Sequence, residues 1–368
     1  MHVLMTADTV GGVWTYTREL LTQLSRRGIR ITLVSFGELP TTSQLEWLEE
    51  LADISFHPTA FRLEWMQDAQ SDLEQSAELL KEIIAEEKPD LLHFNQFYYG
   101  ALDCDLPRIV VAHSDVVTWW VAVHGAEPSD NEWIRGYRQN VERGWRAADL
   151  GIAPTTWMLN EACRYYGEPR RKAAICNGRD PKLFVPDQPK QDCAISVGRL
   201  WDAGKQPTLL LHNDLPLQTI LVGSEQSPVG AVASAQSAGN YPKLRMLGPQ
   251  TEAQLRELFA RAALYIATSR YEPFGLAPVE AALSRCAIVA NDIPSLREVW
   301  GEAAIYFETN NSTNLLLTIQ ELASNSARVR VYADRAFERA RTIFNSERMA
   351  EDYLALYRSL VSAEVALA

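Results

Sequence analysis

The sequence of 368 residues predicts an α/β protein made of two doubly wound parallel-sheet domains in series. Short apolar runs of strand length alternate with segments of helical periodicity, and this alternation occurs twice along the chain. Apolar strands separated by helices are typical of a parallel sheet covered by helices on both faces. Residues 185–193 lie between the two halves and hold two prolines among mostly polar side chains, which suits a linker.

The first half opens with a strand at residues 2–8, HVLMTAD, and a helical pattern at 13–28. That pattern ends in Gly28, and glycine just past the last periodic residue is a common helix stop. Further buried strands are expected at residues 29–36, 90–95, 108–114, 149–154 and 173–177.

The second half repeats the design. Helices are expected at residues 251–262 and 275–286, and residues 311–366 are helical throughout by pattern. Ligands of open parallel sheets bind beyond the carboxyl ends of the strands, so we expect the two domains to face each other across a cleft lined by these ends. The strands of this half are expected at residues 193–200, 219–223, 244–248, 264–269, 287–292 and 304–308.

Composition excludes several classes of protein. Acidic residues outnumber basic ones 47 to 35, and the formal charge of -12 argues against a general nucleic-acid binder, which needs a basic face. The five cysteines form no C-x-x-C pair, so we expect neither a disulfide framework nor a zinc site. No apolar run approaches the ~20 residues of a membrane span, and a cytoplasmic location is expected. The mixed aromatic and basic stretch at 164–172 leaves membrane contact open, although a solvated helix end is the simpler interpretation.

Two sets of polar residues follow strands of the first half. Gly11 and Gly12 come after the first strand and precede a helix, so backbone amides and a helix dipole could cradle a phosphate or a sugar. The spacing is not that of a dinucleotide-binding fingerprint, and such glycines are often only structural. His113 ends another strand and could donate to a substrate hydroxyl, or be a satisfied half-buried histidine. The acceptor-side candidates near it are Asp115, Trp119 and Tyr98.

A basic pair follows the first strand of the second half. In GRLWDAGK, Arg199 and Lys205 stand six positions apart in a loop that leads toward Pro207. The forked guanidinium of arginine and the point charge of lysine suit a diphosphate. The alternative is a pair of solvated surface bases, but their place directly after a strand favours a binding role.

The stretch RYEPFGLAPVE places Glu272 before a turn and Glu280 inside the helix that follows. Between the two carboxylates, the amides of Phe274, Gly275 and Leu276 form a helix N-terminus that favours an anion. One carboxylate can take the hydroxyls of a ribose and the other those of a second sugar, which is the layout of a sugar nucleotide. Glu280 alone could merely relieve the helix dipole, but the pair is harder to dismiss.

Together these residues resemble the retaining glycosyltransferases of the GT-B fold, in particular glycosyltransferase family 4. The resemblance spans nearly the whole chain in the family's order. It rests on the two glutamates in E-x(7)-E spacing, the basic pair, the Gly-Gly loop, the histidine, and an Asn-Gly-x-Asp element formed by Asn177, Gly178 and Asp180. The sequence departs from the family in having Pro273 before Phe-Gly and in lacking Gly-x-Pro before residue 287, so donor identity cannot be transferred from one subfamily.

The resemblance implies two Rossmann-like domains at residues 1–185 and 186–345, with residues 346–368 packing back on the first. It implies a nucleoside diphosphate sugar held mainly by the second domain, an acceptor held by the first, and no metal or cofactor. Glu280 would hold the ribose, and backbone groups near Leu247 and Gly248 would read the base. The catalytic residues implied are Glu272 and His113 beside the transferred hexose and Arg199 and Lys205 at the leaving diphosphate.

The acceptor implied is a hydroxyl of a glycan, a lipid-linked molecule or a small molecule. Two other functions fit the same residues. One is a GT-B nucleotide-sugar epimerase, which would need acid–base groups at the sugar itself. The other is a non-catalytic module that binds a sugar nucleotide or a glycan, against which the presence of all five elements argues.

Overall fold

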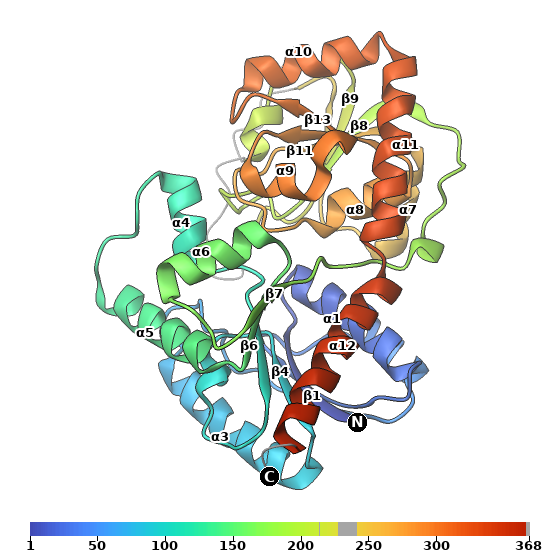
Figure 1. The fold of residues 1–368 in the computed structure, drawn as a ribbon. Helices are drawn as coiled ribbons and strands as arrows, with labels where there is room; N and C mark the ends of the chain where they lie inside the picture. The colour runs from blue at the N-terminus through green and yellow to red at the C-terminus, as the bar shows by residue number, and fades with distance from the viewer. Residues whose placement is uncertain (213, 227–240, 366–368) are drawn as a thin grey trace. The chain divides into compact units, whose positions relative to one another are not determined.

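The computed structural model describes residues 1–212, 214–226 and 241–365, and they form two compact units (Figure 1). Unit 1 comprises Met1–Val121, Ala126–Gly178 and Ser346–Ala368, and unit 2 comprises Ala122–Gly125 and Arg179–Asn345. Each unit contains a parallel sheet with helices packed on it, so the predicted fold class of two doubly wound α/β domains is confirmed.

The described residues of unit 1 form a seven-stranded parallel sheet in the order β3-β2-β1-β4-β5-β6-β7. The order reverses between β1 and β4, which pair directly, so the carboxyl ends of these two strands flank the topological switch point. The strands are β1 (His2–Asp8), β2 (Arg30–Phe36), β3 (Ile54–Pro58), β4 (Leu91–Phe94), β5 (Arg108–Val111), β6 (Leu150–Ala153) and β7 (Lys172–Ala174).

Two apolar clusters cover the faces of this sheet, because successive strand side chains alternate between them. Val3 and Met5 of β1 belong to the cluster formed with α1 (Gly12–Ser25) and α12 (Ser346–Val365), which lie side by side (Figure 1). Leu4 belongs to the other cluster. That cluster includes α3 (Gln70–Glu87), the 3-10 turn η2 (Tyr98–Ala101), α5 (Glu132–Ala147) and α6 (Thr156–Tyr166). The smaller elements are α2 (Thr42–Leu45), η1 (Glu46–Glu50) and α4 (Val116–His124).

The described residues of unit 2 form a six-stranded parallel sheet in the order β10-β9-β8-β11-β12-β13. Its switch point lies between β8 and β11, which pair directly. The strands are β8 (Gln191–Val197), β9 (Gln218–Val222), β10 (Leu244–Leu247), β11 (Ala262–Ala267), β12 (Ala287–Asn291) and β13 (Ala304–Phe307). The helices are α7 (Glu252–Arg261), α8 (Leu276–Leu283), α9 (Pro294–Trp300), α10 (Ser312–Ala323) and α11 (Ser326–Ile343), with 3-10 turns η3 (Pro181–Leu183), η4 (Pro207–Leu210) and η6 (Gly301–Ala303).

Some predicted boundaries differ from the structure. The helical stretch predicted at 311–366 is three helices, interrupted where Asn325 caps α11 and again at residues 344–345; residue 366 lies outside the described residues. The strand predicted at 173–177 is the three-residue β7, and β3 was not predicted at all. Phe184 is buried within unit 2, and its ring packs under the guanidinium of Arg179. Across the part of the chain that the structure describes, no helix is long and apolar enough to span a bilayer.

Candidate functional site

The loops after β8 and β11 meet at the switch point of unit 2. Arg199 and Lys205 follow β8, and Glu272 follows β11. Because β8 and β11 are adjacent and parallel, their carboxyl ends lie at the same sheet edge and bring these residues together.

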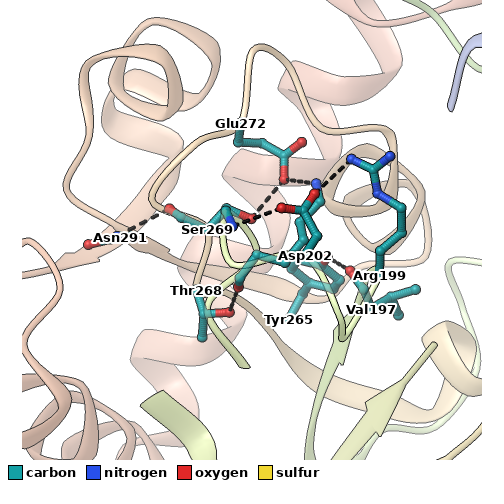
Figure 2. Close-up of polar contacts among 10 residues, drawn as sticks. Val197, Arg199, Asp202, Tyr265, Thr268, Ser269, Glu272 and Asn291 are labelled. Carbon is teal, nitrogen blue, oxygen red and sulfur yellow. Dashed lines mark hydrogen bonds and ion pairs between the residues drawn. The ribbon is translucent and has the colours of Figure 1, made fainter. Parts of the chain in front are cut away.

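Lys205 and Glu272 form an ion pair at this edge, with 2.6 Å between Lys205 Nζ and Glu272 Oε2. Ser269 Oγ donates to the same carboxylate oxygen at 2.8 Å (Figure 2). Thr268 Oγ1 donates to the backbone carbonyl of Lys205 at 2.7 Å, which ties the two loops together. Among the described residues, the second carboxylate oxygen of Glu272 accepts no hydrogen bond, so one oxygen is anchored and the other remains able to accept.

Arg199 is held by a carboxylate of its own loop. Its Nη2 donates to Asp202 Oδ2 at 2.8 Å, and Asp202 Oδ1 accepts the amide of Gly204 at 2.8 Å (Figure 2). The guanidinium also lies over the ring of Trp201, 5.2 Å from its centroid. Asp202 is buried while the Arg199 side chain is 43% exposed. The loop therefore presents a cation that is oriented but still reachable by a ligand.

The Pro-Phe-Gly turn leads into α8 through a backbone conformation that favours glycine. Gly275 is the N-cap residue of α8, with φ 89 and ψ 93. A Cβ at this position would lie 3.1 Å from Glu272 Cγ, so glycine also leaves room for the glutamate. Phe274 is buried against Phe344, with ring centroids 5.3 Å apart. The amide of Leu276 thus belongs to a helix N-terminus that can take an anion.

Glu280 lies one turn further into α8 and has a different partner from Glu272. Its Oε1 is 3.0 Å from Nε of Arg179, a residue that is 1% exposed. The two glutamates of RYEPFGLAPVE are therefore fixed by two separate cations.

Leu247 ends β10, and Gly248 follows it at the surface. The carbonyl of Leu247 accepts the amide of Gly223 at 3.2 Å. β10 is two strands from β8 in the sheet order, or about 10 Å at ordinary strand spacing. Both residues are at the same sheet edge as the basic pair, on the side of β9.

Gly11, Gly12 and His113 belong to unit 1 and are placed within it. Gly11 caps α1 with φ 85, and Asp8 Oδ1 accepts the amide of Val10 at 3.0 Å, so the loop after β1 is a tight turn into the helix. His113 follows β5 and lies 2.8 Å from Asn95 Oδ1 through its Nε2.

The hydrogen bonds around His113 define its tautomer. Asn95 Nδ2 donates to the carbonyl of Thr6 at 2.6 Å, so Asn95 Oδ1 is an acceptor and His113 Nε2 carries the proton. Burial lowers the pKa of His113 to about 3, and the ring of Tyr16 packs edge-on at 4.5 Å. The imidazole is therefore neutral at pH 7, with Nδ1 as its accepting nitrogen.

The structure holds the acceptor-side candidates firmly within unit 1. Asp115 is buried, and its Oδ1 accepts the amide of Thr118 at 2.8 Å and the hydroxyl of Tyr166 at 2.7 Å. Burial raises the pKa of Asp115. Tyr98 is 8% exposed and lies beneath the guanidinium of Arg143. Trp119 is half-buried against Trp120. Asp115 and Tyr98 thus have clear roles in holding the fold, and Trp119 keeps accessible surface.

Four residues of these networks were not singled out from the sequence. Ser269 and Asn95 end segments predicted as strands, and Asp202 lies in the loop between Arg199 and Lys205. Their position was therefore a usable signal, although their partners were not predictable. Arg179 gave only the signal of a basic residue inside the Asn-Gly-x-Asp element.

Two Rossmann-like units in series are the architecture of the GT-B fold. Comparison with known families supports this class: the model described as Glycosyltransferase Family 4 matches residues 10–183, and the model described as Glycosyl transferases group 1 matches residues 188–339. The chain is a member of the GT-B glycosyltransferases and resembles family 4 within them.

Individual relatives agree with this assignment. The chain is 25% identical over 305 residues to the alpha-maltose-1-phosphate synthase of Mycolicibacterium smegmatis, covering 73% of this chain and 76% of the relative. It is 24% identical to the D-inositol 3-phosphate glycosyltransferase of Segniliparus rotundus, covering 78% and 70%. Among solved structures, the sucrose-phosphate synthase of Thermosynechococcus elongatus superposes with a TM-score of 0.80 at 18% identity, over 99% of this chain and 100% of that one. Anabaena Alr3699/HepE, solved with UDP and glucose, gives a TM-score of 0.74 at 15% identity over 98% and 100%.

Proposed function

We propose that this glycosyltransferase transfers a hexose from a nucleoside diphosphate sugar to a hydroxyl acceptor, with retention of the anomeric configuration and without a metal ion. Arg199 and Lys205 stabilise the leaving diphosphate, Glu272 binds hydroxyls of the transferred hexose, and Glu280 binds the ribose. The observation that carries the proposal is the Lys205–Glu272 ion pair at the switch point of unit 2, 2.6 Å between charged atoms. The ion pair supports the proposal because an ammonium suits a phosphate and a carboxylate suits sugar hydroxyls, and the two groups lie side by side.

The charges at this site suit the reaction. The bond between the sugar C1 and the diphosphate oxygen breaks, and negative charge accumulates on that oxygen. The ammonium of Lys205 and the guanidinium of Arg199 are oriented before the donor arrives, which makes them effective stabilisers of the developing charge. A new bond forms between C1 and the acceptor oxygen. The proton of the acceptor hydroxyl passes to the departing phosphate oxygen, so the transfer needs no further acid or base.

The remaining parts of the proposal concern partners and location. The base is read by backbone groups near Leu247 and Gly248, and the acceptor, whether glycan, lipid-linked or small molecule, is bound by unit 1 near Trp119. His113 accepts a hydrogen bond from a hydroxyl of the hexose through its Nδ1. A cytoplasmic location suits a chain whose five cysteines are all free thiols.

A thermal-shift screen of UDP, GDP and ADP and their hexose conjugates identifies the donor. A ligand present at 100 times its Kd stabilises the folded protein by about 2.7 kcal/mol, which is a measurable shift. UDP and UDP-glucose are the first probes, because the Anabaena neighbour was solved with them. If none of these compounds raises the melting temperature, the proposed function is contradicted.

Single substitutions then test the site. We expect Lys205→Ala and Glu272→Ala each to lower kcat/KM by about 10²- to 10³-fold, the size of effect found when one electrostatic stabiliser is removed. The matched controls are Lys243→Ala, which precedes β10 at the opposite sheet edge, and Glu257→Ala, which is exposed on α7. Both controls should keep wild-type turnover. Full transfer by folded Lys205→Ala and Glu272→Ala enzymes would rule out the assigned roles, and a new epimer formed from donor alone would indicate the epimerase.

A further inference from the structure

Arg179 is a buried arginine at the point where the chain enters unit 2. It is the first residue of that segment, and its side chain is 1% exposed. Arginine is almost never fully buried unless it is paired, because removing the guanidinium from water is costly. The surroundings of Arg179 must therefore repay a large desolvation cost.

The backbone of Arg179 is fixed independently of its side chain. Its amide donates to the carbonyl of Phe344 at 2.9 Å, and it forms an isolated parallel bridge with Asn345. Arg179 and Asn345, the first and last residues of this segment of unit 2, thus run side by side. The position of the Arg179 Cα does not depend on what the guanidinium contacts.

The guanidinium reaches two carboxylates on different helices. Glu280 of α8 is 14% exposed, with its Oε1 3.0 Å from Arg179 Nε. Glu252 of α7 is 40% exposed, with its Oε1 3.8 Å from Arg179 Nη2. The ring of Phe184 covers the guanidinium at 5.6 Å. The contact with Glu280 is the shorter and less solvated of the two, so it is the stronger interaction.

A carboxylate offers about four acceptor positions, so an ion pair at one oxygen does not use its whole hydrogen-bonding capacity. Glu280 can accept hydroxyl groups while the ion pair with Arg179 holds one of its carboxylate oxygens in place. Two hydroxyls on neighbouring carbons need a carboxylate that is held in place, because both hydroxyls must meet accepting lone pairs at once.

We infer that Arg179 is a positioning residue that holds the Glu280 carboxylate in the orientation that binds the two ribose hydroxyls of the donor. This inference rests on the proposed function, in which Glu280 binds the ribose. Arg179 acts through Glu280 and touches no part of the sugar nucleotide itself.

Isothermal titration calorimetry with UDP, 2′-deoxy-UDP and 3′-deoxy-UDP tests the inference, with the GDP or ADP set substituted if the screen selects those bases. We expect the wild-type enzyme to prefer the ribonucleotide by about tenfold for each hydroxyl, the ratio expected for one hydrogen bond to a charged group. Arg179→Met should abolish most of this preference and leave the affinity for the deoxy compounds unchanged. Glu252→Gln, which alters the weaker partner, should keep the preference.

Arg179→Lys covers the case in which Arg179→Met does not fold. Lysine keeps the charge but lacks the rigid fork, so the ribose preference should fall severalfold while deoxynucleotide affinity stays constant. A merely structural role for Arg179 would lower all affinities alike or none. Arg179→Lys with a wild-type ribose preference overturns the inference. A wild-type enzyme that binds nucleoside diphosphates without preferring ribose overturns the role of Glu280 and the inference with it, whereas one that binds none overturns the proposed function first.

Discussion

At the scale of residues, each cation of the proposed donor site lies beside a carboxylate. Lys205 pairs with Glu272, Arg199 with Asp202 and Arg179 with Glu280. The pairs orient the cations before any donor binds, which reduces the reorganisation needed at the moment of reaction. They also impose a limit, because an incoming diphosphate must compete with Asp202 and Glu272 for the cations it contacts.

Gly275 gives the first prediction at this scale. Gly275→Ala should lose about 1–2 kcal/mol of stability, because its φ of 89 is a conformation that a residue with a Cβ adopts at that cost. It should also lower kcat/KM, since the new methyl group would press on Glu272 Cγ at 3.1 Å and turn the carboxylate away from Lys205. Thermal unfolding and donor-dependent transfer are measured on the same preparation.

Gly301 supplies the matched control. It lies in the same unit with φ 49, and a Cβ there would meet no atom within 4 Å. Gly301→Ala should therefore lose stability and keep kcat/KM. Equal activity losses in the two variants would mean that the effect of Gly275→Ala comes from general destabilisation and not from crowding Glu272.

At the scale of elements, long or doubly buried segments were predictable and short edge segments were not. Strand β1 is apolar along nearly its whole length because both faces are covered, so the sequence pattern is unambiguous. Strand β3 is a five-residue edge strand of half-buried residues, and its ISFHP sequence carries no strong alternation. Strand β7 has only three residues, although the sequence predicted a strand as far as residue 177. Like β3, it is an edge strand that is paired on one side only, so its sequence does not mark where the strand ends.

The pairing of α12 with α1 and β4 gives the prediction at this scale. Tyr357 of α12 is buried, and its hydroxyl lies 2.6 Å from Nδ1 of His93 on β4. Tyr357→Phe should cost about 1–3 kcal/mol of unfolding free energy, because it leaves a buried imidazole nitrogen without this partner. Urea denaturation measures the loss.

Ser359→Ala on the same helix is the control for Tyr357→Phe. Its side chain is exposed and bonds only within the helix, to the carbonyl of Leu356. Its unfolding free energy should stay within about 0.5 kcal/mol of wild type. A Tyr357→Phe protein as stable as this control would show that the hydroxyl is not needed to dock α12.

At the scale of the whole molecule, the sequence placed the candidate site residues on strand ends but did not reveal their partners. Glu272 and Glu280 are eight positions apart in one segment, and that spacing suggested two carboxylates on one ligand. Their partners, Lys205 and Arg179, lie 67 and about 100 residues away, at distances that only the tertiary structure determines. Local patterns report periodicity and caps, whereas which cation meets which carboxylate depends on the packing of separate strands.

Three groups of unit 1 have strongly shifted pKa values in the acid range, and they dominate the expected response of this unit to acid. Burial lowers the pKa of His93 to about 3, with the charge of His113 as a second cause, and burial lowers the pKa of His113 to about 3. Burial also raises the pKa of Glu64 to about 7, with Asp8 and Asp115 adding to the shift. In unfolded chains the reference values are about 6.5 for histidine and 4.3 for glutamate.

The signs of these shifts predict a loss of stability below pH 6.5. Between pH 6.5 and 3 the histidines bind protons in the unfolded chain but not in the native protein. The contribution of each histidine to the folded state is therefore fully present above pH 6.5 and is lost as the pH falls. Glu64 acts oppositely, since its native form binds a proton below pH 7 while the unfolded form does not until pH approaches 4.3. Between pH 6.5 and 5 each group changes the free energy of unfolding by about 2 kcal/mol. For these three groups alone, two losses and one gain leave a net loss of about 2 kcal/mol of unfolding free energy.

His93→Gln should remove most of this acid sensitivity. Glutamine can still bond the hydroxyls of Tyr16 and Tyr357 that contact His93, but it cannot bind a proton, so one of the two losses disappears and the profile from pH 6.5 to 5 becomes nearly flat. Urea unfolding followed by tryptophan fluorescence reports mainly unit 1, because of the ten tryptophans only Trp201 and Trp300 belong to unit 2. A His93→Gln protein that loses as much stability on acidification as wild type would show that His93 is not held neutral in the folded protein.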